Sequence, residues 1–447
     1  MRLGKTSVIL LLCLCSIPRA QAGATLFLGE PYGHDASFAG TGHAAVYLSG
    51  VCATSPVVLR RCLPGETGIV ISRYFRVGGY DWIAIPLIPF LYAVENEDDI
   101  PLFADRRLVS LLRDRYRRAH LESLIPDLPD GGTPGGNWYQ LTGASYLRTI
   151  YTFEIETSPE QDENLIRMLN DRPNRQRWNL IKANCADFAR QILSFYYPHS
   201  VHRSIVGDLG VTTPKQLAST LSKFSRAHPD LQTSSFVIPQ VPGTIPPSKR
   251  VRGVLELAVT AKKYMVPMLL LQPHVAGIMA VGSVEHWQYR PGKHAPILDS
   301  KHELDAALTR DTRRAFQNRL DEMVRSSSSE ADLNEHDWQS LRAAAQPALD
   351  SSGGPTFLVQ MGGGVTSVGV SRTNILKAPA GSEFAVGLVT ARLREELQSG
   401  VAQKTARADV ESDLILLQEL LESRTSGLAS TGSFATNSGT LAAGDIR

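Results

Sequence analysis

One stretch near the middle of the chain constrains its fold more than any other, because it combines a helix start, an apolar stripe and a cysteine. Asn184 is a preferred N-cap residue, and Pro198 ends any helix that begins there. Between them the apolar side chains recur at helical spacing and form one stripe: Phe188, Ala189, Ile192, Leu193 and Tyr196. We therefore predict a largely buried helix with Cys185 in its first turn. The free N–H groups and the positive dipole end at this position favour a thiolate.

A candidate base for this thiol lies upstream, at the start of a predicted strand. His43 follows the glycine-rich turn 40–42, and residues 43–49 alternate as a half-buried strand does. If the Cys185 helix packs across this strand, sulfur and imidazole come within reach of each other. A thiol nucleophile needs such a base. The chain order is then histidine first and cysteine second.

The two motifs together resemble the circularly permuted branch of the papain-like superfamily, which contains the NlpC-type peptidases and the lecithin:retinol acyltransferase-like proteins. In that branch a histidine begins a strand, and the nucleophilic cysteine opens a later helix within Asn-Cys-x-x-Phe. Residues 42–47 and 184–188 match this pattern, and the resemblance covers residues 24–197, under half of the chain. It implies an α+β fold in which an antiparallel sheet packs on the cysteine-bearing helix, followed here by a mixed, mostly helical C-terminal region. It also implies a secreted or periplasmic bacterial protein.

The same family places a third polar residue on the strand after the histidine strand, where that residue orients the imidazole. Here this strand is predicted at residues 69–74, and it contains neither histidine nor aspartate. Ser72 is the candidate, because it shares one strand face with Val70 and Tyr74 and is a small polar group between them. The alternative is that Ser72 is a solvent-facing strand residue.

The first 22 residues read as a secretory signal peptide, with a basic start, an apolar stretch and a small-residue cleavage site. Its removal takes away three basic residues and changes the formal net charge from +2 to −1, which argues against a nucleic-acid-binding protein. It also leaves Cys52, Cys62 and Cys185. In an oxidising compartment we expect a Cys52–Cys62 disulfide and a free Cys185. The alternatives are an inert, buried Cys185 or one that pairs with either other cysteine.

Two further segments bear on the substrate. The segment 80–92 is apolar and aromatic with two prolines, and it either lines a cleft or packs over the core. We expect Tyr47, Trp82 and Asn184 to contact the substrate. A helix predicted at 102–124 carries arginines that we interpret as a solvated face, with contact to anionic lipid or glycan as the alternative: Arg106, Arg107, Arg113, Arg115, Arg117 and Arg118.

The C-terminal half is less informative. Residues 264–284 contain no formal charge and are long enough to span a bilayer, but the basic residues before them oppose that orientation. A buried hairpin or a membrane-surface segment is the alternative, so association with a membrane rests on this segment. Residues 355–371 predict a β-hairpin, and its glycine run lacks the lysine and hydroxyl of a phosphate loop.

These features divide the chain into five parts. We predict a signal peptide (1–22), a papain-like thiol domain (23–230), a Pro-rich linker or wrapping arm (231–250), a C-terminal region of unassigned role (251–425) and a disordered tail (426–447).

The expected function is that of a periplasmic or secreted cysteine-dependent hydrolase or acyltransferase. Cys185 would attack a carbonyl, and His43 would carry the thiol proton to the leaving group, so that an acyl-enzyme forms. The resemblance implies amide bonds of cell-wall peptides, or ester-linked acyl groups of lipids or lipoproteins, as substrates. The sequence contains no His/Cys set with metal spacing, and we expect no cofactor. The alternative is a non-catalytic envelope protein that uses the papain-like core as a binding module.

Overall fold

The computed structural model describes residues 22–32, 40–175, 177–203, 208, 210–229, 231, 233–254, 256–257, 289–291, 310–327, 343–361, 364–371, 383–398 and 407–431. The signal peptide expected up to residue 22 lies outside these residues except for its last position, and so does the segment 264–284. No helix within the described ranges is long and apolar enough to cross a membrane.

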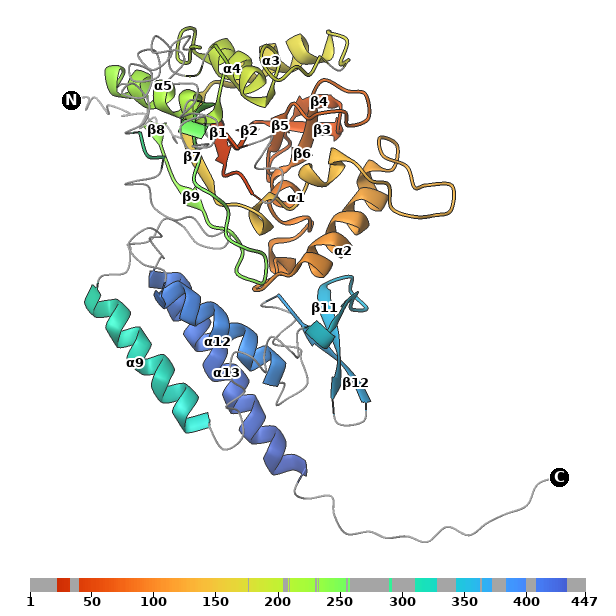
Figure 1. Ribbon diagram of the computed structural model, residues 1–447, viewed down its shortest axis with the longest axis vertical. Coiled ribbons are helices and arrows are strands. Elements are labelled where there is room, and N and C mark those ends of the chain that lie inside the picture. The colour runs from red at the N-terminus through yellow and green to blue at the C-terminus, as the bar shows by residue number, and fades with distance from the viewer. Residues whose placement is uncertain are drawn as a thin grey trace, which may run out of the picture.

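One antiparallel sheet forms the centre of the N-terminal half. Its strands are β1 (Ala22–Gly29), β2 (His43–Leu48), β5 (Ile69–Ser72), β6 (Ile83–Pro86), β7 (Ile150–Thr157), β8 (Thr233–Ser234) and β9 (Val237–Ile238). They run in the order β6-β5-β2-β1-β7-β8, with β9 also paired to β7 (Figure 1). The last two strands come from the stretch 231–250, which therefore adds to the sheet edge rather than only linking two parts.

Three helices cover one face of this sheet: α3 (Pro159–Asn170), α4 (Cys185–Tyr196) and α5 (Pro214–Ala227) (Figure 1). Every member of the predicted apolar stripe of α4 is buried. The stripe packs against side chains of β1, β2 and β5 that alternate toward this face, among them Leu26, Val46 and Ile71. The predicted α+β architecture, with an antiparallel sheet packed on the cysteine-bearing helix, is therefore present.

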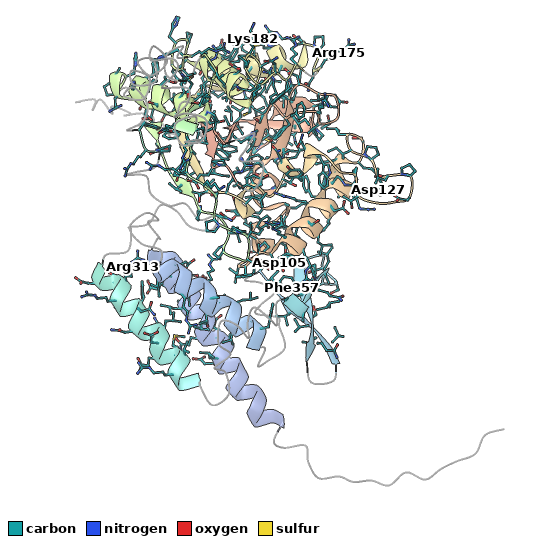
Figure 2. The ribbon with its side chains drawn as sticks, in the orientation of Figure 1. Asp105, Asp127, Arg175, Lys182, Arg313 and Phe357 are labelled. Atoms are coloured by element: carbon teal, nitrogen blue, oxygen red, sulfur yellow. A yellow bond between two sulfur atoms is a disulfide. The ribbon has the colours of Figure 1, made fainter. Side chains whose placement is uncertain are left out.

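The opposite face of the sheet is covered by α1 (Leu87–Tyr92) and α2 (Arg106–Tyr116), which continues as a π-helical turn to Leu121. Short 3-10 turns occur at Glu97–Asp99, Asn137–Gln140 and Ala144–Tyr146. Asp105 caps α2 by accepting a hydrogen bond from the backbone N–H of Leu108 at 2.8 Å (Figure 2). The helix is thus shorter than the predicted 102–124, because its cap excludes the residues before 106.

Only part of the arginine face that we expected is solvated: Arg106, Arg107 and Arg118 are exposed, whereas two other arginines are buried. Arg113 donates to the backbone oxygens of Thr142 and Gly143, and it is buried. Arg117 is fully buried and pairs with Asp114 and Asp127. The pattern was misleading because a guanidinium can enter the interior when carbonyl and carboxylate oxygens receive its N–H groups.

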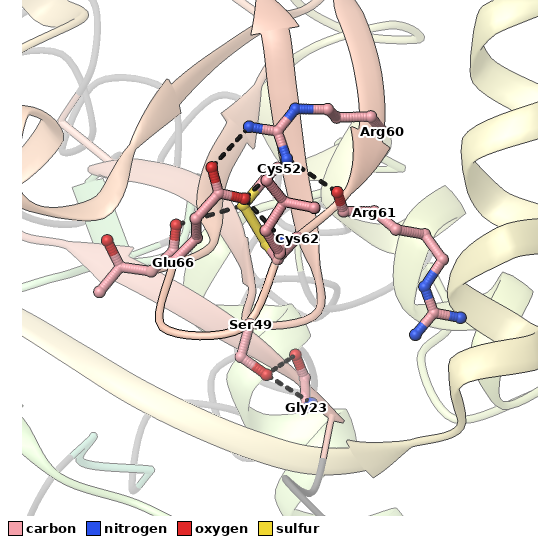
Figure 3. Close-up of a disulfide and its surroundings, with 9 residues drawn as sticks. Gly23, Ser49, Cys52, Arg60, Arg61, Cys62 and Glu66 are labelled. Carbon is pink, nitrogen blue, oxygen red and sulfur yellow. Dashed lines mark hydrogen bonds and ion pairs between the residues drawn. A yellow bond between two sulfur atoms is a disulfide. The ribbon is translucent and has the colours of Figure 1, made fainter.

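A disulfide-closed hairpin projects between β2 and β5. It consists of β3 (Val51–Ser55) and β4 (Val58–Arg61), and Cys52 is bonded to Cys62 (Figure 3). The predicted pairing is thereby confirmed, and Cys185 is a free cysteine. Glu66 binds Arg60 at 2.6 Å beside the bridge. These two sulfur atoms and the Glu66 carboxylate lie close together, but the sulfurs are bonded to each other and are not free to hold a metal.

The described C-terminal region contains α9 (Arg310–Ser327), α12 (Glu383–Gln398), α13 (Arg407–Thr431) and a small sheet of β10 (Gln346–Leu349), β11 (Pro355–Met361) and β12 (Gly364–Gly369). β11 and β12 are the predicted hairpin. α13 extends into the first residues of the expected disordered tail. Arg107 of α2 donates to the backbone oxygens of Ala343 and Ala345, so the region docks on α2 rather than standing apart (Figure 1).

Candidate active site

Hydrogen bonds within the first turn of α4 fix the position of Cys185. Asn184 accepts from the backbone N–H of Asp187 at 2.9 Å, and its side-chain amide donates to the backbone oxygens of Leu180 and Thr212 at 3.0 Å each. Asn184 is buried, and these contacts occupy its carboxamide. Asn184 therefore has a structural role as the helix cap, and its contact with a substrate stays a prediction.

Asp187 completes this helix start and was not among the predicted site residues. It is fully buried, and its carboxylate accepts from the backbone N–H of Asn184 at 3.3 Å. Arg203 and Thr212 also donate to it, at 2.7 and 2.6 Å. An acidic residue three positions after an N-cap asparagine is the sequence signal that could have indicated this reciprocal capping.

The sulfur of Cys185 lies at a gap in the sheet. The β2–β5 ladder pairs Val46 with Ile71 and stops there, because β5 ends at Ser72. The backbone N–H and C=O of Ala44 consequently face the gap without a partner strand. The Ala44 N–H is directed at the Cys185 sulfur, and the Ser72 hydroxyl donates to the Ala44 oxygen at 2.7 Å.

Cys185 is half-buried, and this burial raises the pKa of its thiol. Burial is the largest effect on this group and raises its pKa above the ordinary value of 9.0. The backbone N–H groups of Ala44, Ala186 and Cys185 lower the pKa, as does the charge of Arg148, but these effects are smaller. The helix start favours a thiolate, and burial opposes it by raising the thiol pKa.

His43 is held by Ser72 in one tautomer. Its Nε2 lies 3.1 Å from the Ser72 oxygen. Since the single Ser72 proton is donated to Ala44, that oxygen can only accept, so Nε2 carries the imidazole proton and Nδ1 carries the lone pair. Ser72 is fully buried, which excludes the alternative of a solvent-facing residue.

Two more features define the surroundings of the His43 ring. The ring stacks on Tyr74, with ring centroids 5.3 Å apart. Burial and the nearby Arg148 charge lower the His43 pKa to about 3, so the imidazole is neutral at pH 7. The turn before it requires glycine, because Gly42 has φ +83° and a Cβ there would lie 2.3 Å from the Gly29 oxygen.

A pocket opens beside His43 on the sheet face opposite α4. The enclosed space is small, about 20 Å³ for the centre of a water molecule, and the roughly 380 Å³ of empty space around it includes open solvent. The wall combines apolar and polar side chains, with Phe27, Ala45, Phe90, Ala144, Leu147 and Ile150 as the apolar part and Tyr32, His43, Arg113, Gln140 and Arg148 as the polar part. Arg148 crosses Gly29, where a Cβ would lie 2.6 Å from the Arg148 Cδ.

The structure places the other expected site residues away from this pocket. Tyr47 shares the sheet face of His43, but its hydroxyl is engaged by the backbone of Gly68. Trp82 is buried in the core on the α4 face. Of the segment 80–92, Phe90 lines the pocket.

The described structure shows no direct contact between the Cys185 sulfur and the His43 ring. Cys185 is not among the described residues that line the pocket, and within the described part of the chain no hydrogen bond joins its sulfur to His43. The sulfur reaches the backbone of the residue after His43, and both groups respond to the Arg148 charge.

Of the two pocket arginines, Arg113 belongs to the arginine-rich helix predicted at 102–124, and Arg148 belongs to no sequence motif. Arg148 follows a loop turn and Arg113 lies within the arginine-rich helix, so neither has a local signal of its position. Arg148 lies directly before β7, so the packing of α2 and the pairing of β7 with β1 bring the two arginines to His43.

Comparison of the chain with protein-family models, with curated protein sequences and with solved structures finds no match in any of the three.

Proposed function

We propose that Cys185 is the nucleophile of an acyl-transfer reaction and that His43 is its base, so that the protein is a cysteine-dependent hydrolase or acyltransferase. The observation that carries this proposal is the path from His43 Nε2 through the Ser72 hydroxyl to the Ala44 oxygen. This path leaves Nδ1 of His43 as the nitrogen that can accept a proton. His43 directly precedes Ala44, whose backbone N–H contacts the Cys185 sulfur. In this proposal Ser72 is the orienting residue of a permuted papain-like site.

The chemistry starts from a neutral pair. His43 Nδ1 takes the thiol proton as the Cys185 sulfur attacks the carbonyl carbon of the substrate. The backbone N–H of Cys185, at the start of α4, can donate to the oxyanion. The bond to the leaving group breaks, His43 returns the proton to that group, and a thioester remains on Cys185. Water or an acceptor hydroxyl or amine then releases the acyl group.

Because the Cys185 thiol and the His43 imidazole are both neutral, proton transfer between them depends on a substrate that brings the two groups together. The thiol pKa is raised and the imidazole pKa is lowered, so an ion pair does not form in the empty site. Proton transfer must accompany the attack on the carbonyl. Hydrogen bonds between catalytic groups commonly tighten only in the complex with substrate.

The substrate classes follow from the proposed location. A disulfide is typical of an oxidising compartment, and the proposed periplasmic or secreted site offers cell-wall peptides and lipid or lipoprotein acyl groups. Both present an amide or ester carbonyl to the thiol.

Covalent acylation tests the proposal. The full chain with its disulfide intact is mixed with p-nitrophenyl acetate, and the acetyl group is located by peptide mass mapping. We expect acetyl-Cys185 in the wild type, none at this position in Cys185→Ser, and a rate at least about tenfold lower in His43→Gln. Acetylation of Cys185 at the same rate in His43→Gln would refute the role of His43.

A second function is a non-catalytic binding module. The observation that favours it is that the pocket wall includes His43 but not Cys185, among the described residues. The acetylation experiment decides between the two functions. In a binding module, Cys185 would be acetylated no faster than a free thiol with the same pKa.

A further inference from the structure

A buried arginine without a counter-ion lies in the wall of the His43 pocket. Arg148 is 9% exposed. Within the described part of the chain it has no hydrogen bond or ion pair, and its Nε is buried without a partner. Its guanidinium carbon lies over the face of Tyr32, 4.4 Å from the ring centroid.

Of the Arg148 guanidinium nitrogens Nε is the one buried without a partner, and the charges around it offer no compensation. A buried charge is strongly unfavourable unless an opposite charge or several hydrogen bonds compensate it. The described residues of the pocket wall include no aspartate or glutamate, and Arg113 adds a second guanidinium. Arg113 uses Nε and Nη2 for the oxygens of Thr142 and Gly143, at 2.9 and 3.0 Å. Burial and the Arg148 charge lower the Arg113 pKa to about 10, which still leaves it charged at pH 7.

The remaining wall is apolar. Phe27 and Phe90 lie on one part of it, and Leu147 and Ile150 belong to the segment that also carries Arg148. A ligand that fits all of these groups therefore has an anionic end and an apolar body.

We propose that this pocket binds the anionic group, a carboxylate or a phosphate, of a substrate whose adjoining part is apolar, and that Arg148 is its principal ligand. A guanidinium fork matches either oxyanion in a bidentate manner. Anion binding itself does not depend on the proposed function. Only the position of the reacting carbonyl, on the His43 side of the anion, rests on that function.

Binding of an anion would also change His43. The positive charge of Arg148 contributes to the low pKa of this imidazole. A bound anion offsets that charge, so the His43 pKa rises and the ring becomes a stronger base when the correct substrate is present. Neutral substrates would lack this effect.

The test measures binding rather than catalysis. Isothermal titration calorimetry is carried out on the full chain with hexanoate, hexyl phosphate and the neutral hexanamide. We expect at least one of the two anions to bind about tenfold or more tightly than hexanamide. The tighter anion identifies the source, since a carboxylate points to a peptide or acid and a phosphate to a lipid headgroup.

Variants assign the effect to the residue. Arg148→Gln should weaken anion binding about tenfold or more. Arg175→Gln is the matched control, because Arg175 is exposed and is not among the described residues that line the pocket, and it should bind as the wild type does (Figure 2). Arg148→Lys should retain part of the affinity. Cys185→Ser should bind anions normally, so a failed acylation assay and a failed binding assay are separate results.

Two outcomes overturn the proposal. The first is equal affinity of the wild type for hexanoate, hexyl phosphate and hexanamide, which needs no variant and therefore holds even if Arg148→Gln does not fold. The second is unchanged anion binding in a folded Arg148→Gln, as judged by circular dichroism.

Discussion

The protonation state of Cys185 can be measured directly through the pH dependence of its alkylation. Only the thiolate reacts appreciably with iodoacetamide, so the rate at each pH reports the thiolate fraction. Burial raises the pKa of this thiol above 9.0 and keeps His43 neutral down to about pH 3. The site should therefore behave as an isolated, hindered thiol and not as a thiolate–imidazolium pair.

The magnitude follows from the direction in which burial shifts the thiol pKa. With a thiol pKa of 9.0 or above, the thiolate fraction at pH 7 is about 1% or less. Raising the pH from 7 to 9 should increase the rate about 50–100-fold, and the rate should still rise above pH 9. A thiolate–imidazolium pair would instead give a nearly constant rate from about pH 5 to pH 8.

The assay is a time course of carbamidomethylation at Cys185, followed by peptide mass mapping between pH 5 and pH 10. The protein unfolded in denaturant is the control, because its thiol has the ordinary pKa and full access. His43→Gln should follow the wild-type curve within about twofold, since a neutral imidazole does not stabilise a thiolate. A plateau below pH 8 that disappears in His43→Gln would refute the reasoning.

Three further predictions concern structure and orientation. Ser72→Ala should lower the free energy of unfolding by about 1–3 kcal/mol in denaturant titration, because it leaves His43 Nε2 and the buried Ala44 carbonyl without partners. It should also slow acetylation of Cys185, but by less than Cys185→Ser does. An unchanged acetylation rate would exclude Ser72 as the orienting residue. Replacing Cys52 and Cys62 by serine should cost about 3 kcal/mol in the chain-entropy picture for a separation of 10 residues, and equal melting of the oxidised and reduced wild type would contradict this. Asn184→Ala should destabilise the protein by about 1–2 kcal/mol through loss of the cap, whereas Asn184→Asp should recover part of that loss; equal stability of both variants would show that the cap does not matter.

Features set by neighbours along the chain could be predicted from the sequence alone. The cap at Asn184 and the stripe on α4 depend on residues within a few positions of one another, so the start of the helix and its buried face could be predicted. The alternation after His43 likewise predicted β2. The Cys52–Cys62 pairing was expected from the three cysteines that follow the signal peptide, with pairing of Cys185 as the alternative, and it is confirmed. The antiparallel α+β architecture is confirmed, and its assignment to the permuted papain-like branch stays a proposal.

The chemistry of the site could not be predicted in this way, because it depends on tertiary contacts between distant residues. The partner of Ser72 is the Ala44 oxygen, which is available only because β5 ends where it does, and this contact selects the His43 tautomer. Burial, which no local pattern measures, reverses the pKa effect of the helix start on Cys185. Arg148 reaches His43 only through the pairing of β7 with β1, which carries its side chain across Gly29. A helix cap is determined by a few residues that are neighbours in the sequence. A pocket and its electrostatic field are determined by residues that only the assembled sheet brings together.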